Sequence, residues 1–311
     1  MQTFSLTLQL VIAAVFSSLI SGEDCVWNKD NDYPGYPPLL INKDTWISLK
    51  AVKENDERVV RIAENTVVVV ACSGTLIQSL QEEVVEGFCE GGQNLNIGGS
   101  SYTISDLGCS SVVKNSISPT LNPCGADDQG VTTLIGFNVP GYSFYPTINV
   151  CFYTDTETNM YSEHVVYGEN VDAGDGNPDK PYFVDDVQFY PTIDPNECYL
   201  TANQDEYFTS LMGDPDFIDL DTSIYFARGH MAPNADFLTD MEADASYHYL
   251  NAVPQWQVYN GGNWMYLESD VRDLAESHRS NLHIFTGPWQ NLVLNDVNNN
   301  PTTIYICNSQ E

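Results

Sequence analysis

The pattern of hydrophobic and polar residues predicts short β-strands in the first half of the chain. Up to about residue 141, runs of β-branched residues alternate with glycine, asparagine and proline, as in NTVVVVACSG at 65–74. Such runs, bounded by turn-forming residues, are typical of strands. One stretch differs, since LIQSLQEEVVEGFC at 76–89 predicts a helix that closes at Gly87. We therefore expect a small β-rich module that contains one helix.

The second half of the chain combines strand and helix patterns. The stretch TSIYFARGHM at 222–231 predicts a strand, which Pro233 ends. The stretch TDME at 239–242 is a capping box and predicts the start of a short helix. From Asn263 onward, apolar residues recur at helical spacing and predict a longer helix. This half is therefore expected to have an α+β fold.

The composition of the sequence changes near residue 145, where runs of β-branched residues give way to stretches rich in tyrosine and aspartate. We place a domain boundary there, with a β-rich module at 23–144 and a second domain at 145–311. Eight cysteines, an even number, predict four disulfides in an exported chain, and five of them precede the boundary. Complete pairing then requires at least one bridge between the halves. The Asp- and Gly-rich stretch at 171–180 lacks the spacing of a calcium-binding EF-hand loop and predicts a solvated turn.

Residues 4–20, FSLTLQLVIAAVFSSLI, carry no charge and precede small residues. They predict a secretory signal peptide at 1–22 that is cleaved near Gly22, although no Lys or Arg precedes them. A membrane anchor is the alternative, because 17 residues can marginally span a bilayer. We expect a secreted, extracellular protein without a membrane attachment after cleavage.

The charge of the chain limits how it can bind polyanions. Its formal net charge is −32, with 43 acidic residues against 11 Lys and Arg. This composition excludes a protein that is held to nucleic acid by general electrostatic attraction. Any phosphate site must therefore be local, and we expect it to be assisted by a metal.

Two groups of polar residues suggest such a site. Strand alternation puts Arg228 and His230 on the same side, where an imidazole can take a proton from water and a guanidinium can bind phosphate oxygens. Asn260, Trp264 and Glu268 are four residues apart. This spacing puts an amide oxygen and a carboxylate on one side of a helix.

Four motifs, in this order, resemble those of the DNA/RNA non-specific endonucleases, a ββα-metal family that includes endonuclease G and the Serratia nuclease: RGHMAP, NAVPQ, NGGNWMYLE and FTGP. The gaps also match, with nine residues from Asn251 to Asn260 and eight from Asn260 to Glu268. The similarity covers about 145–290 and extends to digestive nucleases secreted by arthropods. It implies a ββα-metal core, an antiparallel sheet with helices, behind a small β-rich, disulfide-containing module.

The resemblance also implies an activity and a role for each matching residue. The activity is Mg²⁺- or Mn²⁺-dependent hydrolysis of phosphodiester bonds in DNA, RNA or both, leaving 5′-phosphate ends. His230 would be the general base and Asn260 the direct protein ligand of the metal. Arg228 and Glu268 would bind or stabilise the phosphate and the waters on the metal, and Asn251 would support the site. The oligomeric state stays open.

Three features depart from the family pattern. The family usually has Asp where this chain has Ala227, and the stretch FYPTIDPN at 189–196 lacks the basic residue expected upstream. The family also continues with another core strand and helix, whereas this sequence ends at Glu311. The domain is therefore expected to be truncated, or to end differently with Cys307 fixing its last strand. These departures keep a second hypothesis open, a catalytically silent relative that binds nucleic acid or a protein.

Overall fold

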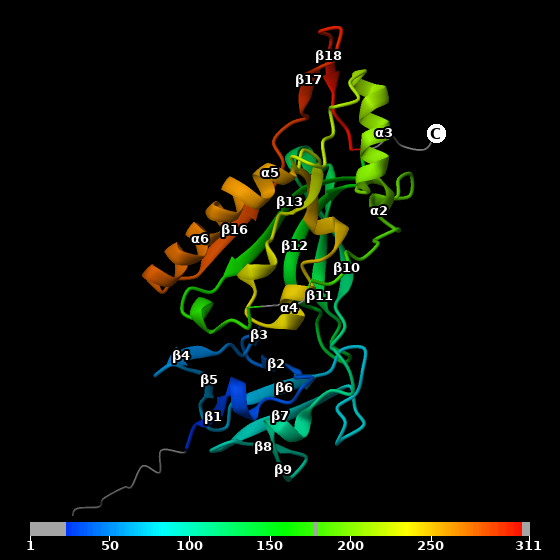
Figure 1. Cartoon of the computed structure of the whole chain (residues 1–311). Coiled ribbons are helices and arrows are strands. Elements are labelled where there is room, and N and C mark those ends of the chain that lie inside the picture. Colours follow the sequence, from blue (N-terminus) through cyan, green and yellow to red (C-terminus); the bar gives the residue numbers. More distant parts are fainter. Residues whose placement is uncertain (1–22, 177–179, 307–311) are drawn as a thin grey trace, which may run out of the picture.

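The structure is a computed structural model that describes residues 23–176 and 180–306. The predicted signal peptide and Cys307 lie outside these residues. Figure 1 shows the strands of the N-terminal part below and a larger unit above, which carries a five-stranded sheet and the helices α3 and α6. The expected α+β class is confirmed, with antiparallel sheets and a disulfide-bonded β-rich module in front. Within the described residues, no helix is long and apolar enough to cross a membrane.

The N-terminal module contains two antiparallel sheets. One has six strands in the order β3-β2-β6-β7-β8-β9, and the other has the order β1-β5-β4. Disulfides join Cys25 to Cys89 and Cys72 to Cys109 within the module. Its elements are β1 (Cys25–Asn28), α1 (Lys29–Asp32), β2 (Leu39–Asn42), β3 (Ile47–Ser48), β4 (Val52–Glu54), β5 (Glu57–Ile62), β6 (Val67–Ala71), β7 (Val84–Gly91), β8 (Asn94–Ile97), β9 (Ser100–Thr103) and the 3₁₀ helix Ile104–Leu107.

The helix predicted at 76–89 is wrong, because this segment forms a turn followed by strand β7. The strand lies between β6 and β8, and both neighbours pair with it in antiparallel register. Burial alternates along it, with Gly87 and Cys89 facing the core. A side chain at Gly87 would meet Ile97 at 2.8 Å, so the close approach of β8 requires a glycine. Pairing with distant strands therefore overrides the local helical spacing.

The larger unit is built on a five-stranded antiparallel sheet with the order β10-β11-β12-β13-β16. The boundary near residue 145 stays a prediction; the sheet spans it, since two strands precede it and β12 begins there. The Cys124–Cys151 disulfide joins residues on either side of 145, so the expected bridge between the halves is confirmed. The strands are β10 (Ser116–Cys124), β11 (Gly130–Phe137), β12 (Tyr145–Tyr153), β13 (Thr158–Val166) and β16 (Leu282–Thr286).

A pair of antiparallel strands followed by a helix lies beside this sheet. The strands are β14 (Phe226–His230) and β15 (Ala252–Trp256), and α6 runs alongside β16 (Figure 1). The remaining elements are the 3₁₀ helices Ala126–Asp128, Val171–Ala173, Asn234–Asp236 and Tyr249–Asn251, the helices α2 (Pro195–Cys198), α3 (Thr201–Met212), α4 (Asp240–Asp244), α5 (Gln257–Tyr259) and α6 (Met265–His278), the π-helical turn Asn260–Trp264, and the strands β17 (Val293–Asn295) and β18 (Pro301–Thr303).

The predicted strand and both predicted helices of this half are confirmed. Strand β14 ends at His230, before Pro233, and α6 covers the segment with helical spacing. Helix α4 begins after Thr239, whose hydroxyl accepts a hydrogen bond from the backbone N–H of Glu242, as a capping residue does.

Buried polar contacts join the module to the larger unit. The Glu242 carboxylate accepts hydrogen bonds from Ser48 Oγ at 3.0 Å and from Tyr145 Oη at 3.4 Å, and Lys50 Nζ lies 3.4 Å from the same oxygen. Lys50 Nζ also lies 4.2 Å from the centroid of the Tyr167 ring. Because one apolar cluster runs through both parts, the module and the larger unit share a core.

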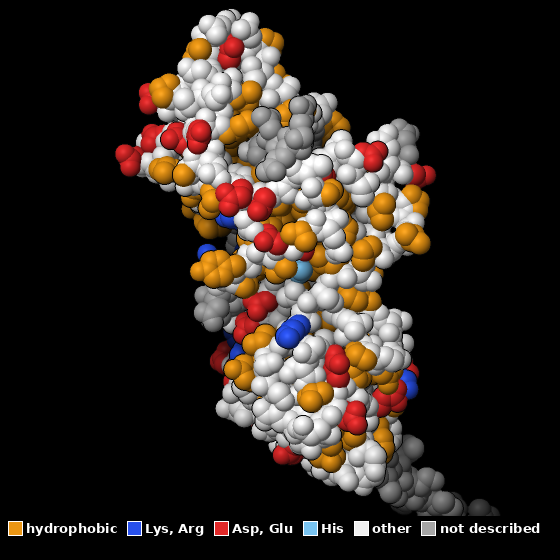
Figure 2. Space-filling model, turned by 90° about the vertical axis from the view of Figure 1, so that its right-hand side faces the viewer, with side chains coloured by type: hydrophobic (Ala, Val, Ile, Leu, Met, Phe, Trp, Pro, Cys, Tyr) orange, Lys and Arg blue, Asp and Glu red, His pale blue; other side chains and the backbone are white. Residues whose placement is uncertain are grey.

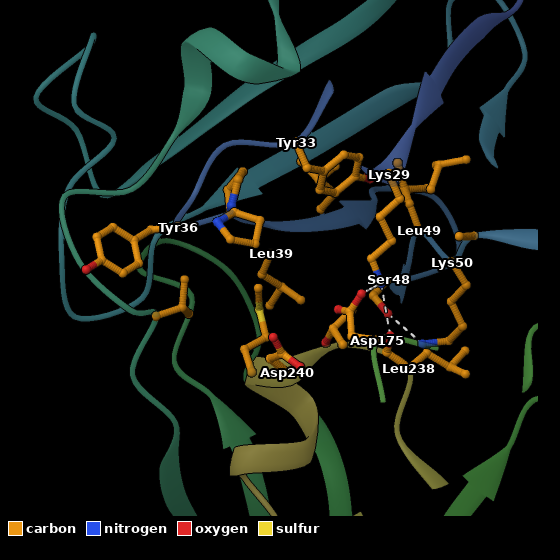
Figure 3. A pocket seen from close by; sticks show the side chains of 18 of the residues that line it. Lys29, Tyr33, Tyr36, Leu39, Ser48, Leu49, Lys50, Asp175, Leu238 and Asp240 are labelled. Carbon is orange, nitrogen blue, oxygen red and sulfur yellow. Dashed lines mark hydrogen bonds and ion pairs between the residues drawn. The ribbon is translucent and has the colours of Figure 1, made fainter. Parts of the chain in front are cut away.

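A cavity of about 320 Å³ lies at this junction. Figure 3 shows Leu39 and Leu49 of the N-terminal part on one side and Leu238 and Asp240 on the other. The cavity shows that the two parts meet along an incompletely filled surface of apolar and charged side chains.

Candidate active site

Strand β14 carries the Arg-Gly-His sequence and pairs with β15. Arg228 lies opposite Pro254, and His230 lies opposite Ala252. A Cβ atom at Gly229 would lie 2.6 Å from the Gln255 side-chain oxygen and 3.1 Å from the Val253 carbonyl oxygen. The glycine between these two candidate site residues is therefore required by the close approach of β15.

His230 lies among aromatic rings. Its ring centroid is 5.0 Å from that of Phe183 and 4.8 Å from that of Tyr247. The residue is partly exposed, yet its Nε2 atom is buried and has no hydrogen-bond partner among the described residues. Burial, with a smaller contribution from the positive charge of Lys180, lowers the pKa of His230 to about 4. The imidazole is therefore neutral at physiological pH.

Arg228 is held by a hydroxyl group and by aromatic rings. Its Nε donates a hydrogen bond of 2.8 Å to Tyr249 Oη. The guanidinium carbon lies 5.2 Å from the ring centroid of Tyr199 and 5.8 Å from that of Phe183. Because Phe183 contacts both Arg228 and His230, the structure brings these two site residues to one aromatic surface.

Asn251 is fully buried just before β15. Its Oδ1 accepts hydrogen bonds from Ser162 Oγ at 2.8 Å and from the Ala232 N–H at 2.9 Å. Its Nδ2 donates to the carbonyl oxygens of Ala232 and Ser246, both at 2.9 Å. Asn251 thus fixes the chain just beyond His230 and fastens it to strand β13.

Asn260 begins the π-helical turn that precedes α6. The turn contains a break at Gly262, whose φ and ψ of −117° and −114° are not helical. The Asn260 residue is partly exposed, and its side chain makes no hydrogen bond within the described part of the chain. The Gln257 N–H donates to the Tyr225 carbonyl at 2.8 Å, which holds the start of this helical segment beside the start of β14.

Glu268 belongs to a group of charged residues around Asp236. The Asp236 carboxylate lies 2.7 Å from His164 Nε2 and 2.9 Å from Arg272 Nη1. Burial raises the pKa of Glu268 to about 7, and the negative charge of Asp236 adds to this, whereas Arg272 opposes it. The sequence analysis missed Asp236 and His164; the only local signal is the position of Asp236 six residues after His230.

Of the five predicted site residues, Asn260 lies on the turn before α6, and the other four lie in three groups. Arg228 and His230 share the Phe183 ring, Asn251 is buried directly behind their strand, and Glu268 lies with Asp236 and Arg272. No hydrogen bond or ion pair among the described residues links His230 to Asn260 or to Glu268. Figure 2 shows acidic side chains spread over one face of the molecule, with few basic ones.

The residues present are compatible with a divalent cation of the kind that keeps most of its waters. Across residues 23–176 and 180–306, no three His, Cys, Asp or Glu side chains are grouped as metal ligands would be. Asn260 offers an amide oxygen without a protein hydrogen-bond partner there, and Glu268 is a carboxyl group whose charged form is disfavoured by burial and by Asp236 more than Arg272 favours it. Mg²⁺ suits such a site, because it dehydrates reluctantly and binds through one or two protein oxygens.

The chain is similar in sequence to known nucleases and salivary proteins. The family model for DNA/RNA non-specific endonucleases matches residues 128–306. A salivary endonuclease of Lutzomyia longipalpis is 27% identical over 188 residues, which cover 60% of this chain and 44% of that protein. Salivary protein Tsal2A of Glossina morsitans morsitans is 24% identical over 287 residues, which cover 89% of this chain and 70% of that protein.

Two further matches are shorter. A salivary endonuclease of Culex quinquefasciatus is 32% identical over 149 residues, which cover 47% of this chain and 36% of that protein. The chain thus spans less than half of the two salivary endonucleases that it matches. Among solved structures, the complex of EndoG with EndoGI aligns with a TM-score of 0.34 and 22% identity, over 54% of this chain and 62% of that chain.

Proposed function

Because the chain belongs to the DNA/RNA non-specific endonuclease family, we propose that it is a metal-dependent endonuclease. It hydrolyses phosphodiester bonds of DNA, RNA or both with little sequence selectivity. The observation that carries the proposal is His230, a neutral imidazole that makes no side-chain hydrogen bond within the described residues, on the same strand as Arg228.

His230 acts as the general base. Its imidazole accepts a proton from water, the oxygen of that water attacks phosphorus, and the bond from phosphorus to the 3′ oxygen breaks as that oxygen takes up a proton from solvent. The products are a 5′-phosphate and a 3′-hydroxyl end. The pKa of about 4 keeps the imidazole neutral, so that one ring nitrogen is free of a proton before substrate binds. The negative charge of a bound phosphodiester raises that pKa and so makes the imidazole a stronger base.

Four other residues support this step. Arg228 binds the phosphate oxygens through its guanidinium and stabilises the charge that develops on them. Glu268 contributes a carboxylate on α6, and Asn251 keeps the end of β14 in place through its buried hydrogen bonds. Asn260 would hold the cation, Mg²⁺ or Mn²⁺, which supplies Lewis-acid polarisation of the phosphodiester when bound.

The protein is secreted in this proposal, with residues 1–22 removed as a signal peptide. Two observations support secretion. Three disulfide pairs are present, and Cys198 is disulfide-bonded as well. Disulfides at this density are typical of oxidising compartments, and the relatives described as salivary point the same way.

A plasmid-nicking assay tests the activity. With Mg²⁺ we expect conversion of supercoiled DNA to nicked and linear forms, and with EDTA we expect none. His230→Ala should abolish at least about 99% of the activity, since general-base catalysis contributes 10²-fold or more, while its melting temperature stays close to that of the wild type. No cleavage by the wild type at any Mg²⁺ or Mn²⁺ concentration would favour the catalytically silent alternative.

The substrate is identified by a second experiment. Matched DNA and RNA duplexes, and the corresponding single strands, are digested at several concentrations of divalent metal. Mass spectrometry of the products should show 5′-phosphate termini. Products with 3′-phosphate ends would contradict the proposed direction of bond cleavage.

A further inference from the structure

The two arginines of the candidate active site differ in how their charge is compensated. Arg272 Nη1 lies 2.9 Å from the Asp236 carboxylate, so its charge is largely neutralised. Arg228 forms no ion pair with any residue in the described ranges, and the atom it contacts is the neutral hydroxyl oxygen of Tyr249. Lys53, Lys114 and Lys180 also lack an ion pair within the described residues, but they are exposed, whereas Arg228 is partly buried.

The hydroxyl group of Tyr249 is itself held by a chain of hydrogen bonds. Tyr249 Oη donates to Asn196 Oδ1 at 2.7 Å, and Asn196 Nδ2 donates to the carboxylate of Asp185. A carboxylate can only accept, so the amide of Asn196 must turn its nitrogen to Asp185 and its oxygen to Tyr249. The Tyr249 hydroxyl proton is then committed to Asn196, and a lone pair of Oη is left for the Arg228 Nε–H.

Aromatic rings restrict the guanidinium further. Its central carbon lies 5.2 Å, 5.6 Å and 5.8 Å from the ring centroids of Tyr199, Tyr249 and Phe183. The Tyr199 and Tyr249 rings are stacked, with centroids 5.8 Å apart and planes at 19°. Rings attract a cation without neutralising it, because the interaction arises from their quadrupole.

We propose that Tyr249, held by Asn196, is a positioning residue that orients Arg228 for a phosphate group while leaving its positive charge whole. The proposal rests on the endonuclease function proposed above. Because Nε is occupied by Tyr249, the two terminal nitrogens remain as the donors for phosphate oxygens, and none of them hydrogen-bonds within the described residues. A carboxylate in place of the hydroxyl would orient the guanidinium equally well but would cancel the charge that a polyanionic substrate needs.

The test compares two removals of a buried hydroxyl. Tyr249→Phe keeps the aromatic ring beside Arg228 and removes the hydrogen bond from Arg228 Nε. The matched control is Tyr190→Phe, because Tyr190 Oη is also buried and hydrogen-bonds to Asn159 Oδ1 at 3.1 Å and to the Tyr249 carbonyl at 3.2 Å. We expect Tyr249→Phe to lower kcat/KM for a labelled oligonucleotide by about 10-fold, the usual effect of one hydrogen bond to a charged group, and Tyr190→Phe to change it less than about twofold.

Affinity for thymidine 3′,5′-bisphosphate, measured by calorimetry, gives a readout that does not depend on cleavage. Tyr249→Phe should weaken this binding in the wild-type background and should have no further effect in an Arg228→Ala background, since the two residues act as a unit. An equal loss in both backgrounds, or no loss in either, would overturn the proposal. If Tyr249→Phe does not fold, Asn196→Ala on the partly exposed α2 tests the same chain of hydrogen bonds. This variant should also weaken binding of the bisphosphate.

The outcomes separate this inference from the proposed function. A wild-type protein that cleaves while Tyr249→Phe cleaves equally well contradicts only the positioning role. A wild-type protein that binds the bisphosphate through Arg228 and Tyr249 but does not cleave contradicts only the endonuclease activity. Absence of both cleavage and binding contradicts both.

Discussion

The rings of His230 and Tyr247 meet edge to face, with centroids 4.8 Å apart and planes at 82°. Phe183 and Tyr247 both pack against the imidazole, whose Nε2 atom is buried. Charging this ring is therefore costly, and its pKa falls to about 4. A base that must be neutral is thus available at every pH above that value.

The pH dependence of kcat/KM should reflect this burial. Because His230 is protonated only below its pKa, activity should fall as the pH drops through about 4 and not through 6.5, the usual value for histidine. The measurement is kcat/KM from pH 3.5 to 8 at saturating Mg²⁺, with circular dichroism at each pH to confirm folding. Lys180→Gln serves as a control and should move the acid limb upward, since Lys180 contributes to the lowered pKa. An acid limb near pH 6.5 that persists in Glu268→Gln, and so does not come from the Glu268 carboxyl group with its pKa of about 7, would contradict the burial.

Glu268 should make the protein less stable as the pH rises. Its folded-state pKa is raised from 4.5 to about 7, so the folded state binds the proton more tightly than the unfolded state does. The resulting stabilisation is complete below about pH 4.5 and is lost as the pH rises to about 7 and above. Glu268→Gln cannot ionise, so relative to the wild type it should be more stable at pH 8 than at pH 4.5.

Chemical denaturation at the two pH values, in EDTA, measures this difference. Adding Mg²⁺ at pH 8 should then raise the melting temperature of the wild type more than that of Glu268→Gln, because a nearby cation favours the charged carboxylate. A stability difference between the two proteins that does not change with pH would contradict the raised pKa.

The parts of the fold that the sequence predicted are those set by local chemistry. Strand β14 follows from alternation and from Pro233, and helix α4 follows from the capping pair Thr239 and Glu242. Helix α6 follows from apolar residues at helical spacing. In each case the deciding residues are within a few positions of each other, so the information is present in one short window.

The parts that could not be predicted depend on residues far apart in the chain. Strand β7 has a local pattern that also suits a helix, and only pairing with β6 and β8 decides the outcome. Likewise, the contact of Asp236 with His164 joins residues 72 positions apart, and Phe183 reaches His230 from a different segment. Neither spacing nor composition shows that such side chains will meet.

Asn251 should be a structural requirement as well as a functional one. Asn251→Ala removes four buried hydrogen bonds and leaves the Ala232 N–H and the carbonyls of Ala232 and Ser246 without this partner. Unsatisfied buried groups cost 1 to 3 kcal/mol each, so we expect a loss of at least about 3 kcal/mol in the free energy of unfolding. Urea denaturation measures it, with His230→Ala as the comparison that loses activity but little stability. A loss below about 1 kcal/mol would mean that water replaces these bonds.

Substrate binding should depend only weakly on salt. Between residues 151 and 311 the basic residues are Lys180, Arg228, Arg272 and Arg279. Arg272 is paired with Asp236, and Arg279 lies 3.9 Å from a glutamate. That leaves two cations of this region to displace counterions from nucleic acid.

With two phosphate contacts, affinity should fall by only about 10-fold between 50 and 200 mM salt, whereas six to ten contacts would cost 10³-fold or more. The measurement is KM for a duplex oligonucleotide against KCl concentration at fixed free Mg²⁺, because Mg²⁺ itself competes for phosphates. Lys180→Gln should make the dependence shallower by about one contact, while Lys53→Gln, on strand β4 of the N-terminal module, should leave it unchanged. A steep loss in the wild type would show that cations of the N-terminal module also contact the substrate.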